Sequence, residues 1–368
     1  MRILALTRYD TLGASSRVRF YQYLPYLAEG GIEVETSPFL SNAYLVALYE
    51  HRGRLLSHIA AAYFRRLSAL CKARRFDLLW IEKELFPWLP ALAETFLKRL
   101  GVPYVADYDD AVFHNYDRHR NPLFRALLGR KIDEVMRNAG IVVAGNPYLA
   151  ERARQAGATR VEIVPSVIDL NRYPEPKFSR PRSTSEPVRI GWIGTPSTAP
   201  FLRPVRTPLQ RVADAQDLRL VLIGAGDTDI GVSGAEHLAW SEEREYELLE
   251  TLDVGIMPLA DLPWERGKCG YKLIQYMACG KPVIASPVGV NAEIVEHGVN
   301  GFLASSDGEW TEAITILAND AALRERMGRA AREKIVRAYS LQSQFPRLRE
   351  ILASACPPPS RRRRGSRS

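Results

Sequence analysis

VGIMPLADLPWERGKCGYKLIQYMACGKPVIASPVGV, residues 254–290, contains the pattern that decides the fold of this chain. The apolar runs 254–259 and 282–287 have the length and composition of buried parallel strands. Between them, residues 271–280 follow a helical pattern that ends at Gly280. The stretch therefore predicts a strand, a helix and a second strand, which is the repeating unit of a parallel α/β sheet.

Lys268 and Lys272 stand at the beginning of the predicted helix. A helix N-terminus already presents unpaired N–H groups and about half a positive charge, so cations there do not favour the helix by themselves. A phosphate bound at this end would account for both lysines. We therefore predict an anion-binding site.

The composition is that of a globular protein with more than one domain. The chain has 368 residues, of which 46% are hydrophobic and 25% are charged. It contains no uncharged apolar run of about 18 residues and no visible secretion signal. The four cysteines form neither a CxxC pair nor a metal-ligand spacing. We expect a cytoplasmic protein without disulfides.

The net charge of +8 comes largely from one segment, since residues 354–368 contain five arginines and no acidic residue. Proline, serine and arginine dominate this tail, so we expect it to be disordered. It is either a solvated tail or a tether to anionic lipid, which would make the protein peripheral at the inner membrane surface. Nucleic acid is not an expected partner because no aromatic residue lies among these arginines.

Strand patterns alternate with helical patterns in both halves of the chain, which predicts an α/β fold. The predicted strands are residues 2–7, 32–39, 76–83, 103–110, 140–145, 161–166, 188–194, 219–226, 254–259, 282–287 and 301–305. Residues 169–187 interrupt the alternation with four prolines, serines and mixed charges. The predicted architecture is two doubly wound, Rossmann-like domains with an interdomain cleft, where ligands of such sheets bind. The predicted parts are a first domain at 1–168, a linker at 169–187, a second domain at 188–340, a helix at 341–353 that returns to the first domain, and the tail at 354–368.

The loop after the first predicted strand carries candidate binding residues. Gly13 permits a tight turn, and Ser15 or Ser16 can cap the following helix. Arg17 and Arg19 then fall in the first helical turn, where cations oppose the helix dipole. An anionic ligand or a distant carboxylate would compensate them, and both alternatives stay open.

The fourth predicted strand ends in Asp107, Asp109 and Asp110, and His114 follows closely. Carboxylates at this end of a strand can accept a proton or hold sugar hydroxyls. A divalent metal and a capped turn with solvated carboxylates are the alternatives. His114 is either a base or an ordinary loop histidine.

The first strand of the second half ends in the loop 194–202, in which Gly194, Thr195 and Ser197 offer backbone and hydroxyl donors. The loop has neither the GxGxxG nor the GxxxxGK[ST] pattern. A dinucleotide site and a P-loop are therefore not predicted.

Two segments resemble glycosyltransferase family 4, the retaining GT-B enzymes also described as glycosyl transferases group 1. VPSVIDLNRY at 164–173 is similar to the family segment usually written IPNGVD. PLADLPWERGKCGYKLIQYMACGKPVIASPVGVNAEIVEHGVNGFL at 258–303 is similar to the family's donor-binding signature. The resemblance covers nearly the whole chain.

The resemblance implies a retaining transferase that moves a sugar from a nucleoside diphosphate sugar, UDP or GDP, to a glycan, lipid or other hydroxyl acceptor. It implies that the second domain binds the donor, that the first binds the acceptor, and that no metal or other cofactor is required. The implied pathway is polysaccharide, glycolipid or glycan synthesis. Together with the residues singled out above, the candidate catalytic residues are Lys272, Lys268, Glu265 and Asp109; the candidate donor contacts are Gly13, Gly194, Thr195, Ser197, Gly270, Tyr271, Gln275, Val290 and Asn291; the candidate acceptor contacts are Arg17, Arg19, Asp110 and His114.

The chain departs from the family at two positions. The family commonly has two glutamates eight residues apart, for the sugar and the ribose, and Gly267 and Gln275 stand there instead. Glu265 lies two residues before Gly267 and is the candidate replacement. The alternatives to transfer are a GT-B sugar-nucleotide epimerase and a non-catalytic protein that binds sugar nucleotides.

Overall fold

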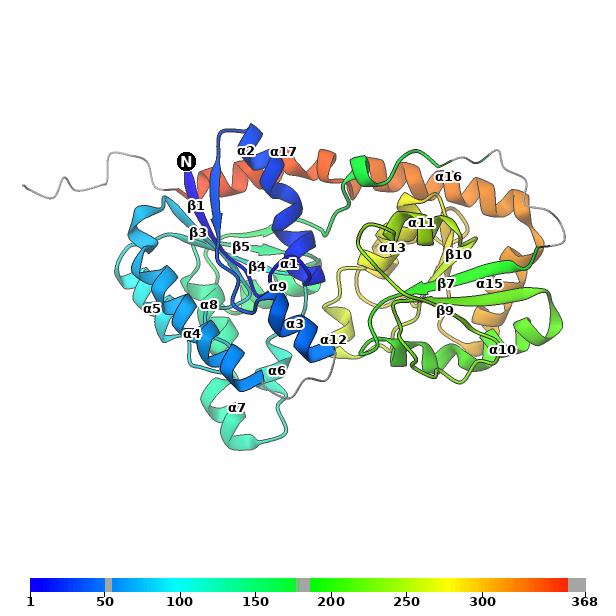
Figure 1. Cartoon of the computed structure of the whole chain (residues 1–368), viewed down its shortest axis with the longest axis horizontal. Helices are drawn as coiled ribbons and strands as arrows, with labels where there is room; N and C mark the ends of the chain where they lie inside the picture. Colours follow the sequence, from blue (N-terminus) through cyan, green and yellow to red (C-terminus); the bar gives the residue numbers. More distant parts are fainter. Residues whose placement is uncertain (50–54, 177, 179–185, 357–368) are drawn as a thin grey trace, which may run out of the picture. The chain divides into compact units, whose positions relative to one another are not determined.

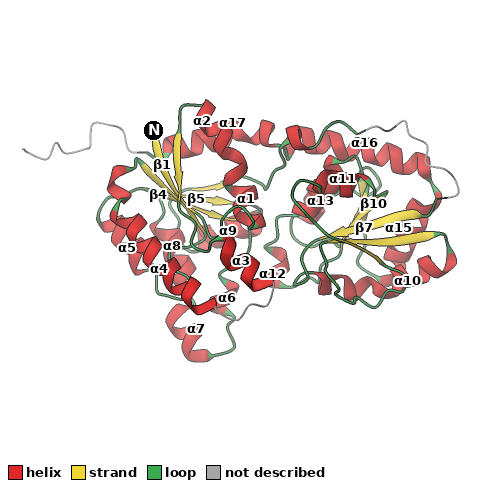
Figure 2. Cartoon of the chain, viewed as in Figure 1, coloured by secondary structure: helices red, strands yellow, loops and turns green. Residues whose placement is uncertain are grey.

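The chain forms two compact units, which Figure 1 shows in the colours of the sequence. The computed structural model describes residues 1–49, 55–176, 178 and 186–356. Unit 1 comprises Met1–Pro165 together with the chain from Phe345 onward, and unit 2 comprises Ser166–Gln344. In both units, strands form the centre and helices surround them (Figure 2).

The sheet of unit 1 has six parallel strands in the order β2-β1-β3-β4-β5-β6. Its central strands are hydrophobic on both faces, as expected where helices cover both sides of a parallel sheet. The strands are β1 (Arg2–Leu6), β2 (Glu33–Thr36), β3 (Leu78–Glu82), β4 (Tyr104–Tyr108), β5 (Ile141–Ala144) and β6 (Val161–Ile163).

The helices of unit 1 connect these strands, and one further helix comes from the end of the chain. They are α1 (Ala14–Arg19), η1 (Tyr21–Tyr23), α2 (Leu24–Glu29), α3 (Asn42–Tyr49), α4 (Leu55–Cys71), η2 (Ala73–Arg75), α5 (Leu92–Arg99), α6 (His114–Asp117), α7 (Pro122–Leu128), α8 (Lys131–Asn138), α9 (Pro147–Gln155) and α17 (Leu341–Ser354).

Helix α17 begins in unit 2, and from Phe345 onward it belongs to unit 1. Leu348, Ile351 and Leu352 are at most 2% exposed. The Phe345 ring lies 5.7 Å from the ring of Tyr26 on α2. The part of α17 from Phe345 onward therefore packs into unit 1.

The sheet of unit 2 also has six parallel strands, in the order β12-β11-β10-β7-β8-β9. The strands are β7 (Val188–Ile193), β8 (Leu218–Ile223), β9 (Glu236–Leu238), β10 (Val254–Met257), β11 (Val283–Ala285) and β12 (Gly301–Leu303). The helices are η3 (Leu170–Arg172), η4 (Ala199–Val205), α10 (Arg206–Ala215), α11 (Glu245–Glu250), α12 (Pro263–Arg266), α13 (Tyr271–Ala278), α14 (Asn291–Ile294), α15 (Asp307–Asn319) and α16 (Ala321–Ala338).

Two strand glycines let neighbouring elements approach the sheet of unit 2 closely. A Cβ on Gly255 would lie 2.2 Å from the ring of Tyr276 on α13, and one on Gly191 would lie 2.2 Å from Leu252. The Tyr276 hydroxyl accepts a hydrogen bond from the Ile193 N–H at 2.8 Å. Helix α13 is thereby fixed against the carboxyl end of β7, where a ligand of such a sheet binds.

The segment predicted as a linker is folded in its first part. The Leu170 N–H donates to Gln342 Oε1 at 3.2 Å. Tyr173 is 3% exposed, and its hydroxyl donates to Glu245 at 2.5 Å. This part belongs to the core of unit 2 because it buries an aromatic ring there. Within the predicted linker, residues 177 and 179–185 lie outside the described residues, as does the predicted tail from 357 onward.

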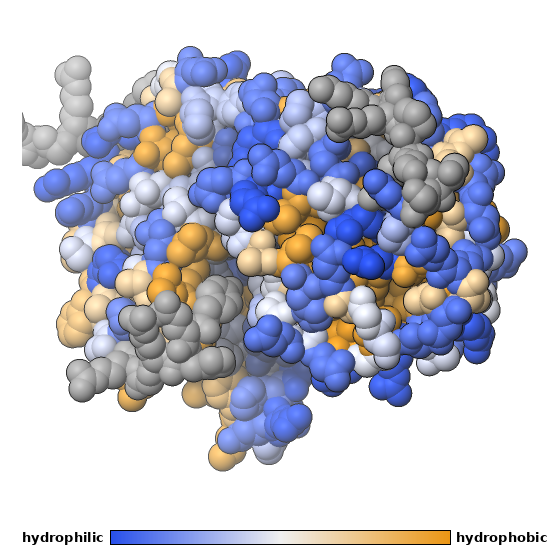
Figure 3. Space-filling model, turned by 45° about the vertical axis from the view of Figure 1, so that its right-hand side comes forward, coloured by the Kyte–Doolittle hydropathy of each residue, from blue (hydrophilic) through white to orange (hydrophobic). Residues whose placement is uncertain are grey.

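On the face that Figure 3 shows, hydrophilic residues cover much of the surface, and hydrophobic residues reach it in patches between them. Among the described helices, none combines the length and the apolar character needed to cross a bilayer.

Candidate functional site

Both predicted lysines lie beside aromatic rings near the beginning of α13. The Lys272 Nζ is 5.3 Å from the ring centre of Trp192 at the end of β7. The Lys268 Nζ is 5.6 Å from the ring centre of Phe201 in η4 and 5.9 Å from that of Trp264 in α12. The two ammonium groups therefore lie where β7, η4 and α12 approach the N-terminus of α13.

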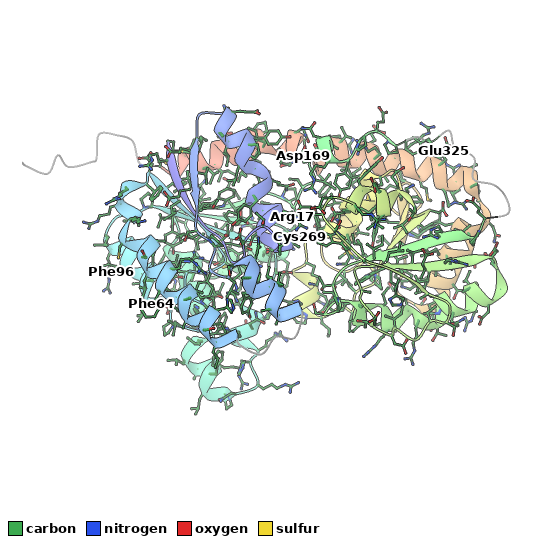
Figure 4. The ribbon with its side chains drawn as sticks, in the orientation of Figure 1. Arg17, Phe64, Phe96, Asp169, Cys269 and Glu325 are labelled. Carbon is green, nitrogen blue, oxygen red and sulfur yellow. The ribbon has the colours of Figure 1, made fainter. Side chains whose placement is uncertain are left out.

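Gly270 gives α13 its N-terminus, next to the buried Cys269 that Figure 4 labels. Its φ of +65° is left-handed, a conformation that glycine adopts without steric cost. A Cβ at this position would lie 2.4 Å from Ile294 on α14. Another residue would therefore push α14 and the preceding loop away from the first turn of α13.

Two buried oxygen atoms in this region have no hydrogen-bond partner among the described residues. They are Glu265 Oε2 on α12 and Asn291 Oδ1 on α14, in side chains that are 7% and 1% exposed. The Asn291 Nδ2 is used internally, because it donates to the Ser286 carbonyl at 3.2 Å. Leaving a buried acceptor unpaired costs about 1–3 kcal/mol, so both atoms call for a ligand that donates hydrogen bonds.

The loop Gly194–Thr198 follows β7 and is ordered by its own polar groups. The Thr195 N–H donates to Thr198 Oγ1 at 3.1 Å, and the hydroxyls of Thr195 and Ser197 are 2.9 Å apart. A Cβ on Gly194 would lie 2.3 Å from Trp192, the residue that also contacts Lys272. The loop and Lys272 are therefore neighbours.

The remaining predicted donor residues of unit 2 also lie around α13. Gln275 is 4% exposed, and Val290 is 5% exposed at the beginning of α14. Tyr271 is half-buried in the first turn of α13. The φ of Gly289 is +54°, and a Cβ there would lie 2.6 Å from the Arg266 carbonyl, so α12 and the loop before α14 touch. Unit 2 thus gathers all of its predicted site residues.

In unit 1, Arg19 and Asp107 form an ion pair. Arg19 Nε donates to Asp107 Oδ1 at 2.8 Å, and its Nη1 donates to the Val164 carbonyl at 2.8 Å. Arg19 is 2% exposed and Asp107 is 1% exposed. Of the two alternatives for Arg19, the distant carboxylate is the correct one. Arg19 is not accessible as an acceptor contact.

Lys83, which the sequence did not single out, joins the carboxyl ends of β3 and β4. Its Nζ lies 3.0 Å from Asp109 Oδ1 and donates to Ser15 Oγ at 3.1 Å. Ser15 Oγ is 2.5 Å from Asp109 Oδ2 and 2.9 Å from Glu82 Oε1. Lys83 also has a φ of +66°, which is uncommon outside glycine and clusters at functional sites. A run of charges directly after a buried strand, as in WIEKE at 80–84, was the available signal.

These contacts fix the charge states of the pair. Burial disfavours the charged form of Asp109, but Lys83 and Ser15 outweigh it and hold the pKa of Asp109 below its usual value. Burial likewise disfavours the charged form of Lys83, but Asp109 and Glu82 raise the pKa of Lys83 above its usual value. Asp109 is therefore an ionised carboxylate at neutral pH.

The expected serine cap of α1 is wrong. The N-cap is Gly13, without a side-chain hydrogen bond, and a Cβ on Gly13 would lie 2.2 Å from Tyr9. Ser16 Oγ lies 2.5 Å from Glu82 Oε2 and accepts from the Tyr9 N–H at 2.9 Å. Both serine hydroxyls donate to Glu82 on the distant strand β3 instead. A hydrogen bond to a buried, ionised carboxylate is stronger than one from a neutral N–H group at the helix end.

The other predicted acceptor residues of unit 1 differ in accessibility. Both ring nitrogens of His114 are engaged, with Asp117 at 2.8 Å and the Tyr148 hydroxyl at 2.9 Å, which favours the ordinary loop histidine. Arg17 is 9% exposed, and its Nη1 donates to the Thr11 carbonyl at 3.3 Å. Asp110 is half-buried beside Asp109. Within the described residues, no group of histidine, cysteine and carboxylate side chains has the arrangement of a metal site.

Two family models match the chain. The description "Glycosyl transferase 4-like domain" covers residues 9–166, and "Glycosyl transferases group 1" covers residues 200–320. The chain belongs to the GT-B glycosyltransferases. The two matches fall in unit 1 and unit 2, and the GT-B fold accounts for the two six-stranded sheets.

The chain is similar to several curated proteins over part of its length. It is 28% identical to the D-inositol 3-phosphate glycosyltransferase of Kribbella flavida over 200 residues, which are 48% of this chain and 47% of that protein. It is 30% identical to the alpha-maltose-1-phosphate synthase of Mycobacterium tuberculosis over 149 residues, which are 34% of this chain and 37% of that protein. The chain thus spans less than half the length of either relative.

Solved structures share the fold over almost the whole chain. The Anabaena protein Alr3699/HepE in complex with UDP-glucose has a TM-score of 0.71 at 18% identity, over 96% of this chain and 100% of that one. The sucrose-phosphate synthase of Thermosynechococcus elongatus has a TM-score of 0.71 at 15% identity, over the same shares. At these identities the likeness supports the fold and no finer property.

Proposed function

We propose that the chain is a retaining glycosyltransferase that moves a sugar from a UDP-sugar to a hydroxyl group of a glycan or lipid-linked acceptor. In this proposal unit 2 holds the donor and unit 1 the acceptor, and the reaction serves polysaccharide or glycolipid synthesis in the cytoplasm. UDP is preferred to GDP because the Anabaena protein with the same fold was solved with UDP and with UDP-glucose.

The observation that carries the proposal is the pairing of cations with unsatisfied acceptors around α13. Lys268, Lys272 and the first N–H groups of α13 suit a diphosphate. Glu265 Oε2 and Asn291 Oδ1 need hydrogen-bond donors, which the hydroxyl groups of a sugar supply. A ligand with both a diphosphate and a sugar meets both requirements.

In the proposed reaction, the bond between the anomeric carbon and the phosphate oxygen breaks, and the acceptor oxygen bonds to that carbon on the same face. The acceptor proton passes to the phosphate oxygen that leaves. Lys268 and Lys272 stabilise the charge that develops on the diphosphate, which is the term that preorganised cations supply best. Glu265 replaces the family glutamate that is absent at Gly267, and Gln275 faces the ribose.

Calorimetric titration with UDP, UDP-glucose and GDP tests the donor assignment. Charged hydrogen bonds contribute about 1.5–3 kcal/mol, so Lys272→Ala should weaken UDP binding by about tenfold or more. Glu265→Gln should weaken UDP-glucose binding and leave UDP binding almost unchanged, because Glu265 is assigned to the sugar. Arg329→Ala is the control for the removal of a cation, since this arginine pairs with Glu325 at 2.6 Å on the exposed side of α16 in unit 2.

Equal affinity of Lys272→Ala and the unchanged protein for UDP would refute the assignment of Lys272. Nuclear magnetic resonance of the product then reports the anomeric configuration, and inversion would contradict the retaining mechanism. Formation of an epimerised sugar nucleotide without an acceptor would establish the epimerase alternative, and binding without any turnover the non-catalytic one.

A further inference from the structure

We propose that the outer face of α4 and α5 in unit 1 binds the surface of an anionic phospholipid bilayer. The proposal does not depend on the donor site of unit 2. We call this surface the α4–α5 face and define it by the apolar residues Leu56, Phe64 and Leu67 of α4 and Leu92, Phe96 and Leu100 at α5, together with the basic residues Lys72, Arg74, Arg75, Lys98 and Arg99.

Helix α4 turns an apolar stripe toward solvent. Leu56, Phe64 and Leu67 are 83%, 74% and 52% exposed, and the exposed Ala60 and Cys71 continue the series. The spacings of four, four, three and four residues place all five on one side of the helix. A stripe with this period normally packs against a core, but here it lies on the outside.

Helix α5 repeats the arrangement. Leu92 and Phe96 are 73% and 59% exposed, and Leu100, directly after the helix, is 39% exposed. The three residues are four apart and share one side of the helix. Phe64 and Phe96 are labelled on their helices in Figure 4, where both lie on the outer side of unit 1.

The topology places α4 and α5 on the same face of the sheet. Helix α4 connects β2 to β3, and α5 connects β3 to β4, in a sheet with the order β2-β1-β3-β4. Both connections cross in the same direction, and parallel crossovers are right-handed in nearly all cases. In the view of Figure 1, α4 and α5 are drawn in the same part of unit 1. The two stripes therefore belong to one surface rather than to opposite sides of the unit.

The charge of the α4–α5 face has a single sign. Residues 55–76 contain no acidic residue, and Lys72, Arg74 and Arg75 are exposed at their end. Lys98 and Arg99 are exposed at the end of α5. The acidic residue of α5, Glu94, is 1% exposed and accepts from the Leu85 N–H at 2.8 Å, so it does not neutralise them.

This combination favours an anionic bilayer over a second copy of the chain. A two-fold dimer brings a patch against itself, which would place the same cations opposite one another. An anionic bilayer attracts the cations and also accepts the apolar side chains at the boundary between headgroups and acyl chains. The contact is peripheral, because none of the described helices can span a bilayer.

Co-sedimentation of the full chain with phosphatidylcholine vesicles, with and without phosphatidylglycerol, tests the proposal. We expect binding to the vesicles that contain phosphatidylglycerol and weaker binding as salt is added. Phe64→Ser with Phe96→Ser, and separately Arg74→Glu with Arg99→Glu, should each lower the partition coefficient by about tenfold or more.

Matched changes in unit 2 serve as controls. Ile316→Ser with Val336→Ser replaces residues that are 36% and 43% exposed on α15 and α16, and Arg326→Glu with Arg337→Glu makes the same change of charge on α16. These four residues lie outside the α4–α5 face, so the control variants should bind as the unchanged chain does. Circular dichroism verifies that every variant is folded.

Three outcomes would overturn the proposal. In the first, the chain does not bind vesicles with phosphatidylglycerol. In the second, the α4–α5 variants bind as well as the controls, which would place the contact elsewhere in the chain. In the third, sedimentation velocity shows a dimer that Phe64→Ser with Phe96→Ser dissociates and vesicles bind nothing, so that a second copy covers the face.

Discussion

Unit 1 and unit 2 have sheets of the same size and strand direction but differ in what they bury. Unit 1 encloses ion pairs at the carboxyl ends of its strands, including Arg19 with Asp107 and Lys131 with Glu84. Unit 2 instead carries glycines within its strands, such as Gly191 and Gly255, which admit neighbouring side chains. None of the six strands described in unit 1 contains a glycine.

The difference shows that the same sheet architecture can place different groups at the carboxyl ends of its strands. Buried ion pairs hold carboxylates such as Asp109 in a fixed place and a fixed charge state. Close packing over glycine brings the N-terminus of α13 to the sheet, and Lys272 lies there beside the Trp192 ring. In the proposed function, the first edge receives hydroxyl groups and the second receives phosphates.

The largest expected effect comes from Asp107→Ala in unit 1. It leaves the buried Arg19 without its carboxylate, and breaking a buried ion pair typically costs about 3–5 kcal/mol. Hydrogen exchange measured by mass spectrometry should show this loss in β3 and β4, whereas β7 and β10 of unit 2 keep their protection.

A double change separates the charge from the packing at this position. Arg19→Met with Asp107→Leu removes both charges and should recover most of the lost stability, because apolar replacements of a buried pair are often neutral. If Asp107→Ala cost less than about 1 kcal/mol, the buried pair would not distinguish unit 1 from unit 2.

A smaller effect is expected from Gly255→Ala in unit 2. The new Cβ would lie 2.2 Å from the Tyr276 ring, and overpacking of this kind typically costs about 1–3 kcal/mol. The same hydrogen-exchange measurement should show the loss in β7 and β10, and UDP binding should weaken as α13 shifts. Gly308→Ala is the control, since the nearest atom to its new Cβ is 3.9 Å away. An equal effect of both changes would contradict the close-packing argument.

The smallest effect, taken over one pH unit, concerns the pH dependence of unit 1. The pKa of Asp109 is below its usual value in the folded chain, so its contribution to stability is complete above the unfolded pKa and is lost as the pH falls through the folded pKa. In the variant Lys83→Met, burial still disfavours the charged form of Asp109, but the lysine that offsets this effect is gone. The pKa of Asp109 in the folded variant should therefore rise above its unfolded value. Acidification should then stabilise the variant, by up to about 1.4 kcal/mol per pH unit for one proton.

Urea denaturation of the two proteins at several pH values between neutral and pH ~4 measures this difference in slope. Lys83→Met with Asp109→Asn is the control, because it lacks the carboxylate and should not show the reversed slope. If the free energy of unfolding changed with pH in the same way in the unchanged chain and in Lys83→Met, the pKa of Asp109 would not depend on Lys83.

The sequence was sufficient for features that depend on local patterns. The apolar runs predicted all but one of the strands, and the predicted α13 lies within one or two residues of the observed helix. The missed strand, β9, has three residues, of which Glu236 and His237 are polar, and it stands at the edge of the sheet. A short edge strand has no apolar run to reveal it.

Features that depend on distant partners were beyond the sequence. Ser15 and Ser16 meet Glu82, 67 and 66 residues away, and Arg19 meets Asp107, 88 residues away. Spacing along the chain favours the nearby helix end for the serines, although the fold brings a buried carboxylate to them. The unpaired atoms of Glu265 and Asn291 likewise appear only when their surroundings are known.

The path of α17 has a consequence for the order in which the chain can fold. Unit 2 is one continuous segment inserted within unit 1, and Leu348, Ile351 and Leu352 of α17 fill the core of unit 1. During synthesis every residue of unit 2 therefore leaves the ribosome before unit 1 receives its last helix. Because domains generally fold as units, the second unit can be complete while the first still waits for α17.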